Sequence, residues 1–227
     1  MAFRPRNEMR DRGTIVFLRS GETRTGVPYT NVRIVTDSGP RKDYPMFRFF
    51  GELAETAAKF EKGDRVCIIG HASLQRKLDE NRQPTNGFQQ IFIGDAIIRS
   101  KRELSRYINL DNISEYDGGH MRDENGAFIT GNVTHVYEVN DETVVVTVLC
   151  ERNNRRDRVN VSCFKRQAEL AKTLKTGDVI AAAGLIQTKN IREQKRIAQS
   201  IVARDMAIDP DPVKKENNEP KREEKDS

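Results

Sequence analysis

An internal repeat constrains the fold of this chain more than any other feature of its sequence. Phe50 aligns with Phe164, Ala54 with Ala168 and Gly63 with Gly177, each pair 114 residues apart. Identity between the halves is low, but short β-like runs and glycines recur in the same order. Charged residues make up 32% of the chain and hydrophobic residues 36%, so two modest cores are easier to fill than one large core. The sequence therefore predicts a duplicated module.

Each copy reads as five short strands with a short helix between the third and the fourth. β-branched and aromatic runs separated by turn residues are typical of strands. This element order predicts an OB-fold, a small Greek-key barrel, with an SH3-like barrel as the alternative. We expect an all-β chain with one short helix per domain, arranged as two tandem five-stranded OB-fold barrels. The expected strands are 14–20, 29–37, 44–50, 65–74 and 89–100, then 127–140, 142–151, 158–164, 178–188 and 196–208.

Composition shifts along the chain suggest the domain boundaries. Residues 1–12 read as a basic N-terminal arm, and residues 106–125, which are polar and aperiodic, suit a linker. The first OB-fold domain then covers residues 13–105 and the second covers residues 126–208. Residues 209–227 have almost no apolar content and three prolines, which predicts a disordered charged tail.

The third strand of each copy indicates the candidate site. Side chains alternate between the two faces of a strand, so Phe47 and Phe49 share one face. Single-stranded nucleic acid offers exposed bases for stacking and phosphates for Lys or Arg. On the opposite face the first copy presents Tyr44, Met46, Arg48 and Phe50, and the second presents Arg158, Asn160, Ser162 and Phe164.

Basic residues in the predicted loops extend this candidate face. Nucleic-acid-binding OB-folds use the loops beside their central strands. The loop between strands four and five contributes Arg76 and Lys77 in the first copy, and Lys189 and Arg192 in the second. The loop between strands two and three of the second copy contributes Arg155 and Arg156. Arg33 and Phe88 complete the predicted binding set.

Several stretches of the first copy resemble bacterial single-stranded DNA-binding proteins. The matching segments are YPMFRFFGELAE, KGDRVCIIG, TNVRIVTD and GTIVFLRS. The resemblance implies that Tyr44 stands where the family has a stacking tryptophan and Phe50 where it has a stacking phenylalanine. In the second copy Phe164 matches such an aromatic, and Arg158 falls where Tyr44 sits. The chain departs from the family in having no Trp, with Leu78 where one is expected, and in ending REEKDS.

Motifs for catalysis are absent from the sequence. There is no Gly-rich phosphate loop of the GxxxxGK[ST] or GxGxxG kind, and the three histidines are scattered. The three cysteines form no CxxC pair, so neither a zinc site nor a disulfide framework is expected. We expect no cofactor, no metal and no enzymatic activity, with a nuclease as the enzyme alternative.

The sequence thus predicts a protein that coats and protects single-stranded DNA in replication, repair or recombination. The net charge of +5 favours a polyanionic partner. Alternatives are an OB-fold interaction scaffold of a replication or DNA-transfer complex, and an RNA-binding protein. We expect a homodimer, possible replication or repair proteins as partners, and no membrane contact. The charged opening, MAFRPRNEMRDRG, lacks the apolar centre of a secretory signal, which favours a cytoplasmic location.

Overall fold

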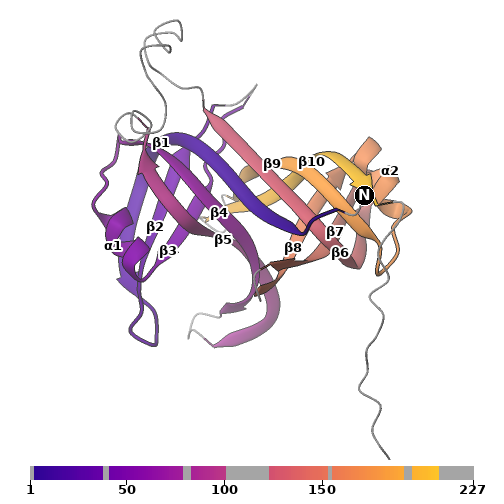
Figure 1. Cartoon of the computed structure of the whole chain (residues 1–227), viewed down its shortest axis with the longest axis horizontal. Coiled ribbons are helices and arrows are strands. Elements are labelled where there is room, and N and C mark those ends of the chain that lie inside the picture. The colour runs from indigo at the N-terminus through magenta and orange to yellow at the C-terminus, as the bar shows by residue number, and fades with distance from the viewer. Residues whose placement is uncertain are drawn as a thin grey trace, which may run out of the picture.

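The structure is a computed structural model that describes residues 3–37, 41–78, 83–100, 123–152, 155–191 and 196–209. Within these ranges the chain is all-β with two short helices (Figure 1). The N-terminal half contains β1 (Arg6–Glu22), β2 (Pro28–Val35), β3 (Met46–Phe50), α1 (Glu52–Ala58), β4 (Arg65–Leu78) and β5 (Pro84–Arg99). The C-terminal half contains β6 (Glu124–Asn140), β7 (Thr143–Arg152), β8 (Arg155–Phe164), α2 (Arg166–Lys172), β9 (Val179–Ile191) and β10 (Arg196–Ile208).

Hydrogen-bonded strands run through both halves as one sheet. Its order is β2-β3-β5-β4-β1-β6-β7-β8-β10-β9, with further pairings β1–β2 and β6–β9 that close each half upon itself. The prediction of an all-β chain with a helix between the third and fourth strands is confirmed. The prediction of two barrels needs a correction, because the pairing of β1 with β6 makes the two halves one continuous ten-stranded sheet.

The repeat extends to the turn that precedes the fourth strand of each half. Gly63 and Gly177 share a φ of 98°, a left-handed conformation that glycine adopts without strain. The amide of Ile15 donates to the Asp64 carbonyl at 2.8 Å, and the amide of Val133 donates to the Asp178 carbonyl at 2.7 Å. The same turn therefore fastens the first strand of each half.

The core follows the predicted alternation along the third strand of each half. Phe47 and Phe49 are fully buried, while Met46, Arg48 and Phe50 are half-buried on the other face. In β8, Val159, Val161 and Cys163 are fully buried. Burial of such apolar side chains is the main favourable term in folding. The outward positions of these strands are free to carry binding residues.

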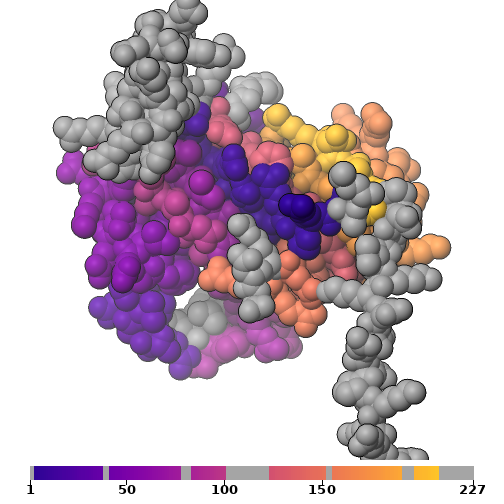
Figure 2. Space-filling model, in the orientation of Figure 1, coloured from indigo at the N-terminus to yellow at the C-terminus, as the bar shows by residue number. Residues whose placement is uncertain are grey.

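The predicted N-terminal arm is largely part of the fold. β1 begins at Arg6, and residues Arg6–Arg12 pair with Thr130–Glu124 of β6. Asn7, Met9 and Asp11 are buried at this junction. Figure 2 shows β1, in indigo, lying across the boundary between the two halves. The sequence predicts an arm here because the residues buried at the junction include polar ones and give little apolar signal. Only the pairing of β1 with β6 shows that this run is a strand.

The β1–β6 ladder relates the two halves symmetrically. Met9 pairs with Gly70 in β4, and Ala127 pairs with Gly184 in β9, so Met9 and Ala127 are equivalent positions. They also pair with each other. Asn7 and Asn125 repeat this equivalence, since the Asn7 amide bonds the backbone of Ala72 and the Asn125 amide that of Ile186.

Two other predicted boundaries shift. Glu124 and Asn125, assigned to the linker, begin β6, and the rest of the linker lies outside the described residues except Asp123. Asp209, assigned to the tail, is buried and accepts a hydrogen bond from the Phe3 amide at 3.0 Å. Residues 210–227 lie outside the described ranges.

Candidate nucleic-acid interface

The outward face of β1, β2 and β3 gathers arginines and aromatic rings in cross-strand rows. Strand register places Phe17 beside Arg33 and Arg33 beside Met46. The next rows join Arg19, Asn31 and Arg48, then Gly21, Tyr29 and Phe50. We call these positions the N-terminal face. It carries three arginines and three aromatic side chains but no carboxylate.

Two of these arginines stack on the rings beside them. The Arg33 guanidinium lies 5.3 Å from the centre of the Phe17 ring, and that of Arg48 lies 4.9 Å from the Tyr29 ring. Arg48 Nε also donates to Asn31 Oδ1 at 2.9 Å. Arg33 Nε is buried without a hydrogen-bond partner, and burial lowers the pKa of this guanidinium. Stacking orients each cation while leaving donors for a ligand.

The equivalent face of the C-terminal half has no arginine or lysine. Register there joins His135, Thr147 and Asn160, then Tyr137, Val145 and Ser162, then Thr143 and Phe164. We call these positions the C-terminal face. Tyr137 is 59% exposed and Phe164 is 40% exposed. Because Phe164 is this exposed, its ring is accessible to a ligand, but the positions of this face include no cation.

Tyr44 and Arg158 occupy equivalent places at the edge of the two faces. Tyr44 precedes β3 and its side chain is 37% exposed, and its amide donates to Thr188 Oγ1 in β9 at 2.9 Å. Arg158 lies on β8, pairs with Leu149 and is exposed. Neither residue lies in the centre of a face.

The β9–β10 hairpin of the C-terminal half docks on the N-terminal half. The Met46 amide donates to Gln199 Oε1 at 3.0 Å, and Gln199 Nε2 donates to the Met46 carbonyl at 3.1 Å. The Thr188 amide donates to the buried Asp43 carboxylate at 2.8 Å. Lys189 follows Thr188 and is exposed, so this predicted cation borders the N-terminal half. Arg192 lies outside the described residues.

The β4–β5 hairpin makes the reciprocal contact. The Asn160 amide donates to Gln90 Oε1 at 2.7 Å, and Gln90 Nε2 donates to the Asn160 carbonyl at 3.2 Å. Arg76 and Lys77, predicted in a loop, lie on β4, and Phe88 lies on β5 opposite Arg76. Phe88 is 51% exposed. The predicted cations of this hairpin therefore lie beside β8 and not beside β3.

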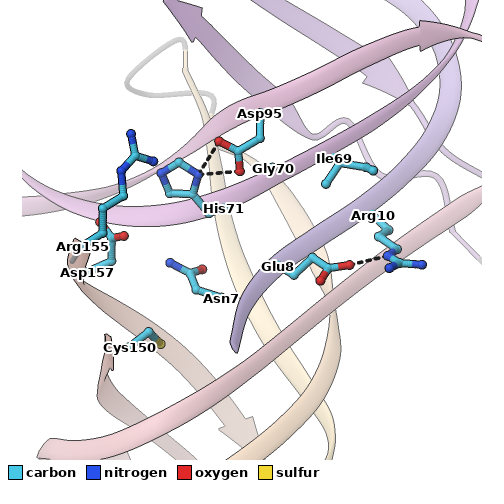
Figure 3. A pocket seen from close by; sticks show the side chains of 10 residues that line it. All are labelled: Asn7, Glu8, Arg10, Ile69, Gly70, His71, Asp95, Cys150, Arg155 and Asp157. Atoms are coloured by element: carbon cyan, nitrogen blue, oxygen red, sulfur yellow. Dashed lines mark hydrogen bonds and ion pairs between the residues drawn. The ribbon is translucent and has the colours of Figure 1, made fainter. Parts of the chain in front are cut away.

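Arg155 and Arg156, also predicted in a loop, lie on β8. Arg156 pairs with Glu151 at 2.7 Å. Arg155 lines a hollow of about 470 Å³ between the halves, where His71 Nδ1 lies 2.8 Å from an Asp95 oxygen and Glu8 pairs with Arg10 (Figure 3). Carboxylates offset the cations of this hollow, which makes it a poor phosphate site.

The sequence did not single out Phe17, Arg19, Tyr29 and Asn31 of the N-terminal face, nor His135 and Tyr137 of the C-terminal face. All lie on the first two strands of a half, which were predicted as strands. The alternation in GTIVFLRS and YTNVRIV already places Phe17 with Arg19, and Tyr29 with Asn31 and Arg33. Strand register, which the sequence does not give, brings Arg19 and Asn31 into one row with Arg48 and Phe17 beside Arg33.

Signs of metal binding or thiol reactivity are lacking in the part of the chain that the structure describes. There, no group of three or more His, Cys, Asp or Glu side chains could hold a metal ion. Burial raises the pKa of the Cys150 thiol to about 12 and that of Cys163 to about 11, which disfavours the reactive thiolate. No helix among the described residues is long and apolar enough to span a membrane.

Comparison with solved structures reveals the same fold in a known protein. No protein-family model matches the sequence, and no curated protein matches it. The wild-type single-stranded DNA binding protein from Thermus aquaticus aligns with a TM-score of 0.60 and 18% identity, over 91% of this chain and 94% of that chain. A deletion mutant of that protein, which also carries an arginine-to-alanine substitution, aligns with a TM-score of 0.60 and 17% identity, over 91% and 95%. At this identity the likeness shows the fold.

Proposed function

We propose that this chain binds single-stranded DNA, with the N-terminal face as its main contact surface. The observation that carries the proposal is the arrangement of Arg33 over Phe17 and Arg48 over Tyr29 on one outward face without carboxylates. Arginines supply phosphate contacts, and exposed rings supply platforms on which successive bases stack. The fold shared with the Thermus aquaticus single-stranded DNA binding protein supports the same function.

The binding mode follows from the geometry of the face. Each base stacked on an aromatic side chain contributes about 1–3 kcal/mol, and every base offers such a surface, so little sequence preference is expected. The arginines neutralise phosphates and release counterions, which makes affinity fall with salt. The net charge of +5 adds general attraction to a polyanion.

Titrations with labelled oligonucleotides test this proposal. We expect submicromolar binding to oligo-dT and oligo-dA and much weaker binding to duplex DNA of equal length. Tighter binding to a matched RNA would favour the RNA alternative. Absence of binding to every oligonucleotide by folded protein would favour the interaction scaffold and overturn the proposal.

We also propose a wider role in keeping with this binding mode. A non-catalytic protein of this kind would coat single strands exposed in replication, repair or recombination in the cytoplasm. A homodimer would bring four closed five-stranded units together around one strand. Sedimentation equilibrium with and without oligo-dT would measure the assembly state.

A further inference from the structure

The β4–β5 hairpin belongs to one half by sequence and contacts the other half by structure. Figure 1 shows this long hairpin reaching from the N-terminal half toward β8. Gln90 holds both backbone groups of Asn160, immediately before β8 pairs with β10 at Val161 and Ser162. The side-chain amide of Gln90 thus bonds the backbone groups of Asn160, which β10 does not pair with.

The side chains on the Gln90 face of the hairpin are known from strand alternation. Phe88 lies two residues before Gln90 and opposite Arg76, so Phe88 and Arg76 share the face that contacts β8. Gln89 lies on the opposite face. Phe88 is exposed, and Arg76 is exposed beside it. One ring and one cation are therefore presented next to Asn160, a member of the C-terminal face.

The positions of the C-terminal face lack a cation, which this hairpin provides. It carries Tyr137 and Phe164 as exposed rings, but none of the positions that define it is a lysine or an arginine. Two described arginines border this face, Arg158 at its edge on β8 and Arg76 on the hairpin. On the N-terminal face Arg19, Arg33 and Arg48 already stand among the rings.

We propose that Arg76 and Phe88 bind the stretch of single-stranded DNA that crosses the C-terminal face, so that this binding surface is assembled from both halves of the chain. The inference rests on the proposed function and adds that the hairpin of the N-terminal half serves the face of the C-terminal half. A base stacks on Phe88, and Arg76 contacts an adjoining phosphate. The hairpin makes no contact with the DNA that lies on the N-terminal face.

Double-mutant cycles on the full chain test the assignment, with affinity for fluorescein-labelled oligo-dT as the readout. In one background the N-terminal face is disabled by Arg48→Ala with Phe50→Ala. In the other the C-terminal face is disabled by Tyr137→Ala with Phe164→Ala. Phe88→Ala and Arg76→Ala are then added separately to each, and circular dichroism melts verify folding. Gln89→Ala, on the opposite face of the hairpin, is the matched control.

We expect Phe88→Ala to raise Kd by about fivefold to 150-fold when the N-terminal face is disabled, the range for loss of one stacked base. It should raise Kd by less than about twofold when the C-terminal face is disabled, and Gln89→Ala should be silent in both backgrounds. A reversed pattern, or equal losses in both backgrounds, would overturn the assignment while leaving DNA binding itself intact. Failure of the wild-type chain to bind oligo-dT would instead overturn the proposed function.

Discussion

The two halves share their inward positions and differ in their outward ones. Phe47 and Phe49 of β3 correspond to Val161 and Cys163 of β8, and all four are fully buried and apolar. Outward, Arg48 corresponds to Ser162 and Tyr29 to Thr143. Duplication of a β unit thus preserves the core that specifies the fold, while surface positions change with little effect on stability.

A second difference lies at the junction. Asp11 in β1 is equivalent to Ile129 in β6, since they pair with Ile68 and Ala182 in the equivalent fourth strands. Both are fully buried, but the Asp11 carboxyl group has no hydrogen-bond partner, and burial raises its pKa well above the ordinary value. The N-terminal half therefore bears the free-energy cost of burying a carboxyl group, and the C-terminal half does not bear it at the equivalent position.

Placing the same carboxyl group in the other half should give the largest effect. Ile129→Asp removes a buried apolar side chain and adds an unpartnered acid, which we expect to destabilise the chain by about 4 kcal/mol. Urea unfolding followed by circular dichroism measures the loss, with Ile129→Val as control. A loss below about 1 kcal/mol would show that the two junction strands are not comparably packed.

Removing the buried carboxyl group of Asp11 should stabilise the protein. A raised folded pKa means that the contribution of Asp11 is most favourable below its unfolded pKa of about 3.9 and is lost as pH rises through the folded pKa. Asp11→Asn should therefore raise the free energy of unfolding by about 1–3 kcal/mol at pH 8 and have less effect at pH 4. Melts across this pH range check the sign, and a stabilisation that grows toward low pH would contradict it.

The outward difference predicts unequal losses of DNA affinity at equivalent positions. Tyr29→Ala should weaken oligo-dT binding by about 1–3 kcal/mol, because it removes a ring and the support of the Arg48 guanidinium. Thr143→Ala, at the equivalent position of the C-terminal half, should change affinity by less than about 0.5 kcal/mol. Equal losses in the two variants would mean that the faces bind alike.

The reciprocal glutamine contacts predict a smaller effect, and an equal one in both halves. Gln199→Leu and Gln90→Leu each leave two backbone groups without their side-chain partner, at Met46 and Asn160. We expect each to lower the free energy of unfolding by about 1–2 kcal/mol in thermal melts. Strongly unequal losses would show that one of the two hairpin contacts does not stabilise the half on which it docks.

The strands, the two helices and the buried side of the third strands were predictable because they depend on local alternation and turn residues. The N-terminal part of β1 was not, because Asn7 and Asp11 give a polar pattern that only its pairing with β6 explains. The outward face was predicted in part. Arg33, Arg48 and Phe50 were found on their strands, whereas Phe17 and Tyr29 become part of the face only through register.

The placement of the basic hairpins could not be predicted from the repeat alone. Gln90 contacts Asn160, 70 residues away, and Gln199 contacts Met46, 153 residues away. Such contacts follow from the antiparallel β1–β6 ladder, which brings each hairpin to the other half. For this reason Arg76 and Phe88, predicted as parts of the first copy's site, lie beside the second.

The salt dependence of oligo-dT binding tests most directly whether the N-terminal face supplies the phosphate contacts. Each neutralised phosphate of a single strand contributes about −0.7 to the slope of log K against log salt. Replacing Arg19, Arg33 and Arg48 together with Gln should flatten the slope by about 2, while Thr147→Ala with Ser162→Ala on the C-terminal face should leave it unchanged. An unchanged slope in the folded triple variant would contradict the account.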